Sequence, residues 1–308
     1  MRFQRLDLNL LVALDALLSE RSITRAAERL HMSQSATSGI LGRLRTYFGD
    51  ELLVQVGRRM EPTLLAQRMQ EPVRELLLQL QRVLELKTDF DPITSTRTFR
   101  IAASDYVVSV LFAEVMKRKV SEFPNMTIEL IPLNEDTRVQ LRRGEIDFMV
   151  IPDNFCESDL PSSPLFEESH VCVVWEGNTL VGDTLNFEQY MRLGHITPRF
   201  GRARQPSFEE WFLKQFGPTR RIEVVTSDFA SVAQLLIGTQ LLATMHTQLA
   251  RRNARYLPLR LLPLPIEIPM LRECLQWHAF QESDPGHLWL RALITTIAST
   301  LDTPGSTH

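Results

Sequence analysis

The chain has 308 residues, which is too long for one small domain and suits two or three. Hydrophobic residues make up 44% and charged residues 23%, a composition that can bury sizeable cores in an ordinary soluble protein. The net charge of −3 excludes a protein coated in basic residues. Residues 1–65 carry nine Arg against seven Asp and Glu, a local excess of +2, so any contact with DNA there requires a few well-placed groups.

The N-terminal segment, residues 1–18, has an early Arg and many leucines, which also mark secretory signal peptides. The polar residues Asp7, Asn9 and Asp15 interrupt it, and no small-residue cleavage site follows. No apolar run is long enough to span a membrane. We therefore expect a cytoplasmic protein without membrane contact.

The cysteines form no CxxC pair, and no cofactor or metal site is predicted from them. We interpret them as buried free thiols in a reducing compartment, with a redox or metal role as the alternative. They are Cys156, Cys172 and Cys274.

Apolar residues near the N-terminus follow helical periodicity. Leucines spaced by three and four residues predict a first helix from about Leu8 to Leu18. Ser22 can cap a second helix. Its inner side would carry the small residues Ala26 and Ala27, which let a crossing helix approach closely, together with Leu30.

A third helix follows after a turn at His31-Met32, with Ser33 as its cap. We expect Ala36, Ile40 and Leu44 on its inner side. Two amphipathic helices separated by three or four residues are the signature of a helix-turn-helix motif.

In such a motif, the exposed N-terminal turns of the last helix enter the major groove of DNA. Gln can bond adenine through two hydrogen bonds, and Ser or Thr can bond bases or phosphates. Arg43 and Arg45 follow at positions suited to phosphate contact. The alternative is an ordinary helical hairpin with a solvated polar face. The predicted DNA-contacting residues at the helix start are Ser33, Gln34, Ser35, Thr37 and Ser38.

The next segment predicts a wing. Residues 52–56 alternate as a strand does, and residues 57–63 form a basic turn ending in proline. A short hairpin with Arg58 and Arg59 at its tip can lie along or in the minor groove of DNA. A solvated turn is the alternative.

A long helix capped by Thr63 carries an apolar seam at heptad spacing, which favours pairing with a second helix over burial within one chain. Pro72 should kink or restart this helix because it removes a backbone hydrogen bond. Residues 89–98 then indicate a hinge. The seam begins at Ala66, and its predicted dimerisation residues are Met69, Val73, Leu76, Leu80 and Val83.

From Phe99 onward, strands alternate with helices, which predicts an α/β region with open, mostly parallel sheets. In such sheets, ligands bind beyond the C-terminal ends of the strands, often between two units. Predicted strands cover 99–103, 127–132, 146–151, 171–175, 222–226 and 273–277, and 241–245 is a further apolar run. Predicted helices cover 104–122, 135–143, 187–191, 208–216, 229–237 and 285–300.

This order of elements resembles that of a LysR-type transcriptional regulator over nearly the whole length. The most specific motifs are 7–11 (DLNLL), 25–30 (RAAERL) and 33–38 (SQSATS). More narrowly, the chain resembles the NodD-like branch, which includes flavonoid-responsive nodulation regulators and regulators of aromatic and chloroaromatic degradation. The matching pieces are 1–3, 10–17, 43–48, 104–106, 200–210 and 283–285.

The resemblance implies three parts: a winged helix-turn-helix DNA-binding domain at 1–65 with its motif at about 23–42, a linker or dimerisation helix and hinge at 66–92, and a periplasmic-binding-protein-like effector domain at 93–308. Lobe I of that domain would span about 93–166 and 267–308, and lobe II about 167–266. The implied partners are promoter DNA, RNA polymerase, a small aromatic inducer and further copies of the chain as a dimer or tetramer.

One departure concerns the recognition helix. The family usually has proline after the recognition glutamine, and this chain has Ser35. A helix start tolerates the loss of that proline, so we expect the change to alter which bases or phosphates are met.

The resemblance also implies an effector cleft lined by strand ends and helix starts. Backbone N–H groups at Ser104 and Asp105 can hold an anionic or phenolic oxygen, although plain helix capping is the alternative. Arg202 can pair with a carboxylate or remain a surface charge. The full set of candidates is Ser104, Asp105, Tyr106, Pro152, Asn154, Phe200, Arg202, Phe229 and His246.

An enzyme finds little support, because the chain lacks GxSxG, Walker, HExxH and dinucleotide motifs. A cytoplasmic small-molecule-binding protein or enzyme built on the periplasmic-binding-like fold remains the alternative. We expect an inducer-responsive activator of a neighbouring operon.

Overall fold

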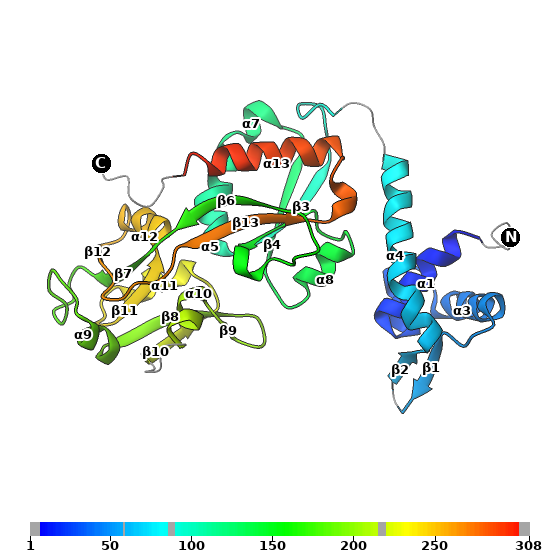
Figure 1. Cartoon of the computed structure of the whole chain (residues 1–308), viewed down its shortest axis with the longest axis horizontal. Coiled ribbons are helices and arrows are strands. Elements are labelled where there is room, and N and C mark those ends of the chain that lie inside the picture. Colours follow the sequence, from blue (N-terminus) through cyan, green and yellow to red (C-terminus); the bar gives the residue numbers. More distant parts are fainter. Residues whose placement is uncertain (1–6, 58, 86–89, 215–219, 302–308) are drawn as a thin grey trace. The chain divides into compact units, whose positions relative to one another are not determined.

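The computed structural model describes residues 7–57, 59–85, 90–214 and 220–301, and the chain divides into two units, Met1–Leu86 and Lys87–His308 (Figure 1). None of the helices in these ranges combines the length and apolar character that a membrane span requires.

The first unit is a three-helix domain followed by a hairpin. Serine hydroxyls start the second and third helices: Ser22 Oγ accepts from Arg25 N, and Ser33 Oγ accepts from Ala36 N at 3.2 Å. Gly49, with a φ of +65°, ends the third helix. The elements are α1 (Asn9–Glu20), α2 (Ile23–Arg29), α3 (Gln34–Phe48), and the antiparallel strands β1 (Leu53–Val56) and β2 (Arg59–Pro62).

The inner face of α3 differs from the sequence prediction. Thr37, Leu41 and Leu44 are buried, whereas Ala36 is exposed, so the predicted face was wrong by one position at the start of the helix. The Thr37 hydroxyl donates to Ser33 O at 3.1 Å, which satisfies its polarity inside the domain. The expected exposure of Thr37 is therefore wrong.

The long helix α4 (Leu64–Glu85) begins inside this domain. Ala66 and Val73 belong to the core formed by α1 and α3, and Arg74 is buried beside α1, where it donates to Asp15 Oδ1 at 3.2 Å and to Ser19 Oγ at 2.9 Å. The helix runs through the exposed Pro72, so the predicted restart there is wrong. Solvent on that side leaves the helix tolerant of the lost backbone hydrogen bond.

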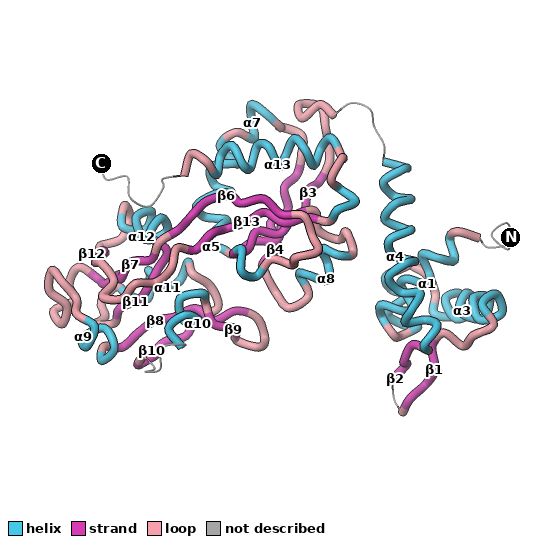
Figure 2. Tube along the Cα trace, viewed as in Figure 1, coloured by secondary structure: helices cyan, strands magenta, loops and turns pink. Residues whose placement is uncertain are grey.

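The second unit contains two mixed sheets (Figure 2). The lobe I sheet has the order β4-β3-β5-β13-β6, and the lobe II sheet has the order β10-β8-β11-β7-β12 with β9 beside β8. Strands β13, β7 and β12 run antiparallel to their neighbours, and β9 runs antiparallel to β8. Two of the four strand pairings in lobe I and three of the five in lobe II are therefore antiparallel, and the expectation of mostly parallel sheets is wrong. The bounds of the lobe I strands are β3 (Thr98–Ala103), β4 (Thr127–Pro132), β5 (Phe148–Pro152), β6 (Ser162–Glu168) and β13 (Leu271–Trp277). Those of lobe II are β7 (His170–Trp175), β8 (Gly194–Phe200), β9 (Gln205–Pro206), β10 (Arg221–Thr226), β11 (Leu242–His246) and β12 (Leu259–Leu262).

The chain crosses between the two sheets twice, once at Ser169 between β6 and β7 and once at residues 263–270 between β12 and β13. Helices flank both sheets. The helix predicted for 104–122 runs from Asp105 to Lys117 through a π-helical stretch, η2 (Val108–Phe112), and is interrupted by a turn at Arg118. The other helices are α5 (Asp105–Val107), α6 (Ala113–Lys117), α7 (Lys119–Glu122), α8 (Thr137–Arg142), η3 (Asp153–Phe155), α9 (Phe187–Arg192), α10 (Phe208–Lys214), α11 (Ala230–Leu236), α12 (Thr247–Ala254), η4 (Ala279–Gln281) and α13 (Pro285–Ala298).

Candidate DNA-binding surface and effector site

The start of α3 presents a polar, solvent-exposed surface. Gln34, Ser35 and Ser38 are exposed and therefore accessible to DNA, while Ser33 caps the helix. The Ser33 and Ser35 hydroxyls lie 3.1 Å apart, so Ser35 adds a polar contact to the Ser33 cap. An α-helix with free polar side chains at its N-terminus is suited to contact base edges in a major groove.

The arginines predicted to contact DNA differ in their surroundings, because some are exposed to solvent and one is hydrogen-bonded within the domain. Arg43 and Arg59 are exposed, whereas Arg58 lies outside the described residues. Arg45 donates to Glu51 O at 2.8 Å and to Leu53 O at 2.7 Å, which ties α3 to the start of the wing. Its guanidinium therefore positions the hairpin and has fewer donors left for a phosphate than we expected.

The predicted dimerisation seam on α4 is partly buried in the first unit and partly exposed. Val73 is part of the first unit's own core and Met69 packs against it. Leu76 is 38% exposed and Leu80 is half-buried, so these later seam residues keep apolar surface that the core of the first unit does not cover. The side chain of Val83 lies outside the described residues.

Several predicted effector residues meet where the lobes touch. Asp105 Oδ2 accepts from Ala230 N at 2.7 Å, which joins the start of α5 in lobe I to the start of α11 in lobe II. The rings of Tyr106 and His246 stack with centroids 3.8 Å apart, and Phe229 meets both rings edge-on. Phe200 joins this cluster through Phe229, with centroids 5.0 Å apart. In this structure these aromatic side chains pack against one another.

Two buried carboxyl groups accompany this cluster, and sequence reasoning missed both. Glu168, the last residue of β6, accepts from Tyr106 OH at 2.8 Å and from Ser169 N at 2.9 Å. Burial raises its pKa to about 7 despite these bonds. Burial also raises the pKa of Glu273 to about 8, and its Oε2 has no partner among the described residues.

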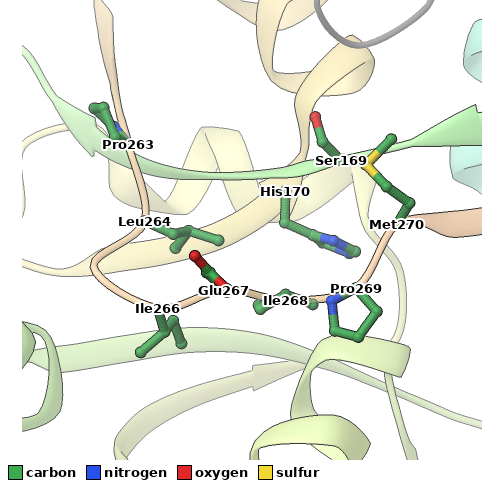
Figure 3. A pocket seen from close by; sticks show the side chains of 9 residues that line it. All are labelled: Ser169, His170, Pro263, Leu264, Ile266, Glu267, Ile268, Pro269 and Met270. Carbon is green, nitrogen blue, oxygen red and sulfur yellow. The ribbon is translucent and has the colours of Figure 1, made fainter.

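A cavity of about 630 Å³ lies between the two crossover segments, and we call it the crossover cavity (Figure 3). The His170 ring points toward the segment that carries Ile268 and Pro269 (Figure 3). Neither ring nitrogen of His170 has a hydrogen-bond partner among the described residues. Burial lowers the pKa of His170 to about 4, so the neutral ring offers one N–H donor and one acceptor at pH 7. The cavity is lined by Ser169, His170, Pro263, Leu264, Ile266, Glu267, Ile268, Pro269 and Met270.

Aromatic rings continue from His170 toward lobe I. His170 lies nearly parallel to Phe208 with centroids 6.2 Å apart, and Phe208 lies 6.0 Å from Trp211 on the same helix, α10. Trp211 in turn meets Phe155 of η3 edge-on at 6.4 Å. The spacing of Phe208 and Trp211 by three residues on a predicted helix could have identified this aromatic pair from the sequence. The irregular segment 263–270 has no such pattern, so its part in the cavity could not have been predicted.

None of the nine predicted effector residues is among those that line the crossover cavity, and four of them also lie outside the aromatic cluster. Arg202 is exposed beside Glu135, whose Oε1 accepts from Ala203 N at 3.1 Å. Pro152 is opposite Glu273 in the lobe I sheet, and Asn154 is exposed. Ser104 Oγ accepts from Val107 N, so its hydroxyl caps α5.

Comparison with family models assigns both units. Residues 8–67 match "Bacterial regulatory helix-turn-helix protein, lysR family", and residues 94–298 match "LysR substrate binding domain".

Comparison with individual proteins covers the full length. "Nodulation protein D 1" of Rhizobium tropici is 44% identical over 308 residues, which is 100% of both chains. The structure of "probable transcriptional regulator PA0477" from Pseudomonas aeruginosa superposes with a TM-score of 0.65 at 29% identity, covering 97% of this chain and 98% of that one. Full-length CbnR, solved in complex with its target DNA, shares the fold with a TM-score of 0.51 at 17% identity, over 95% of this chain and 100% of that one.

Proposed function

Because this chain belongs to the LysR family of bacterial transcriptional regulators, we propose that it activates a neighbouring operon when a neutral phenolic or flavonoid-like molecule binds between its lobes. Regulators of this family bind DNA and small-molecule inducers and act as oligomers. The full-length similarity to a nodulation protein D supports an inducer of this class. We infer that the chain works by binding, without catalysis, and in the cytoplasm beside the DNA.

The observation that carries the proposed inducer class is the chemistry of the crossover cavity. Among the described residues that line it, none is Arg or Lys, and the one carboxylate is that of Glu267. A carboxylate ligand would lack a cationic partner there, whereas a phenol can bond the neutral His170 ring once the lining moves to uncover its buried nitrogens. Apolar side chains such as Leu264, Ile266 and Met270 suit the faces of an aromatic ligand.

The DNA side of the proposal uses the exposed start of α3. Gln34, Ser35 and Ser38 would read base edges, with Arg43 and Arg59 on the phosphate backbone. A second chain would pair through the later part of α4, so that two recognition helices meet two half-sites of one operator.

A reporter driven by the promoter of the adjacent operon tests the inducer class. Phenols, flavones and aromatic acids are compared with the wild-type chain, with His170→Phe and with Arg202→Ala. His170→Phe keeps a ring beside Phe208 and removes the two ring nitrogens that would bond the inducer. We expect it to raise the inducer concentration for half response at least about tenfold.

DNA binding without inducer should be unchanged in both variants. Arg202→Ala should retain the response, because this exposed residue is not among those that line the cavity. Induction by aromatic acids alone, with loss of response in Arg202→Ala only, would instead place a carboxylate ligand on Arg202. Failure to bind any fragment upstream of neighbouring genes would refute the regulatory role.

A further inference from the structure

Two of the three cysteines lie together in lobe I, although they are 118 positions apart in the sequence. Cys274 is on the strand β13 and is buried, and Cys156 directly follows η3 and is half-buried. All three thiols are free. The third, Cys172, is fully buried in the lobe II core.

The backbone explains why the two thiols meet. Cys274 is directly opposite Ile151 in the antiparallel pair β13–β5, so both side chains are on the same face of the sheet. Cys156 packs against the apolar cluster that contains Ile151. The chain after η3 returns along β13 and is fastened there by two bonds: Glu157 N donates to Gln276 Oε1 at 3.2 Å, and Gln276 Nε2 donates to Glu157 O at 2.8 Å.

The pair is chemically asymmetric. The interaction with Cys274 lowers the pKa of Cys156, and the same interaction raises the pKa of Cys274. Burial and the negative charges of Asp153 and Glu273 oppose this lowering of the Cys156 pKa, and the positive charge of Arg138 adds a smaller lowering. Cys156 is thus the more accessible thiol and the one that ionises first, as an attacking thiol requires. Within the described residues, no group of three or more His, Cys, Asp or Glu side chains that could hold a metal ion is found.

We propose that Cys156 and Cys274 form a peroxide-sensitive dithiol that closes to an intrachain disulfide. The Cys156 thiolate attacks one oxygen of hydrogen peroxide, the O–O bond breaks, and Cys156 becomes a sulfenic acid as hydroxide leaves. The Cys274 sulfur then attacks the Cys156 sulfur, forming the S–S bond and breaking the S–O bond. The thiol proton of Cys274 leaves with the displaced hydroxide as water. One peroxide is reduced to two waters, and two thiols are oxidised to one disulfide.

The disulfide would restrict movement at the contact between the two lobes. It would join β13, which enters lobe I from the crossover segment, to the residue that follows η3. The preceding residue, Phe155, meets Trp211 of lobe II, and Phe155 O accepts from Arg138 at 2.9 Å. Fixing η3 to β13 therefore limits the movement of one side of the interlobe contact.

Peptide mapping of the wild-type, full-length chain tests the proposal. The reduced protein is treated with hydrogen peroxide, remaining thiols are blocked with N-ethylmaleimide after unfolding, and the protein is digested without reductant. We expect a peptide pair linked through Cys156 and Cys274 that dithiothreitol separates, and Cys172 recovered with maleimide. Oxidation at Cys156 should proceed at least about tenfold faster than at Cys172.

Variants identify the order of the two steps. In Cys274→Ala, the sulfenic acid on Cys156 should persist and react with dimedone, and in the matched control Cys172→Ala the linked pair should form at the wild-type rate. The proposal is overturned if Cys156 in the wild-type chain proceeds to sulfinic acid, links two chains together, or oxidises no faster than Cys172. Because peptide mapping uses the wild-type chain, a variant that misfolds does not remove the test.

Discussion

The buried carboxyl group of Glu168 makes the stability of the second unit depend on pH. Glu168→Gln removes the ionisable group and keeps its shape. The amide oxygen can still accept from Ser169 N, and the amide nitrogen can donate to the Tyr106 hydroxyl, which is able to reverse its role. The variant should therefore fold with the same contacts while losing the proton equilibrium.

The size of the effect follows from the pKa of this group. Its pKa is about 7 in the folded chain against 4.5 as the ordinary value, so the folded state holds the proton more tightly than the unfolded state. The stabilisation from that proton is fully present below about pH 4.5 and is lost as the pH rises through about 7. At 1.36 kcal/mol per pKa unit, the loss is about 3 kcal/mol. The free energy of unfolding of Glu168→Gln, relative to wild type, should rise by this amount between pH 4.5 and 8.

Urea unfolding of the full chain, followed by tryptophan fluorescence, measures this difference. All four tryptophans lie between residues 175 and 289, so the signal reports the second unit. The matched control is Glu167→Gln, whose exposed carboxylate pairs with Arg272 at 3.1 Å and should show no such pH dependence. An equal difference between Glu168→Gln and wild type at pH 5 and pH 8 would refute the reasoning.

Three further predictions concern the first unit. Gln34→Ala should weaken operator binding by about 1–3 kcal/mol in a mobility-shift titration, with a smaller loss on random DNA; equal losses would make Gln34 a phosphate contact. Leu76→Asp with Leu80→Asp should give monomers in analytical ultracentrifugation, because both introduce charge on the apolar part of α4 left for pairing; an unchanged mass would contradict this. His31→Gly should raise the unfolding free energy of this unit by roughly 0.5–1 kcal/mol in calorimetry, because His31 has a φ of +54°; a lower melting temperature would show that the histidine side chain matters more.

Hydrophobic periodicity and capping residues predicted most helices and strands. They did not predict which face of α3 is buried. Two candidate inner faces, one through Ala36 and Ile40 and one through Thr37 and Leu41, differ by one residue and both suit a helix. Hydrophobicity alone favoured the alanine. The chain instead buries Thr37, because its hydroxyl is satisfied by Ser33 O and does not pay the usual cost of a buried polar group.

The effector region shows a different limit. Asp105, Tyr106, Phe229 and His246 could be grouped in advance, because strand ends and helix starts converge at the same edge of an α/β sheet. Glu168 could not, because its environment depends on Tyr106 and on the crossover between two sheets, which no short window of sequence contains. The same is true of the contact between the two distant cysteines.

The first part of α4 belongs to the core of the first unit, and this affects how DNA-binding and effector domains of such regulators can be joined in chimeras. The helix-turn-helix family model ends at residue 67, yet the core of the first unit continues through Val73, and Arg74 is bonded to Asp15 and Ser19 of α1. A chimera joined at residue 67 would set a foreign helix against α1 and leave Asp15 without that arginine. Exchange of DNA specificity between relatives should therefore keep α1 and α4 from one parent through Leu78, so that the inherited module is longer than the motif that defines it.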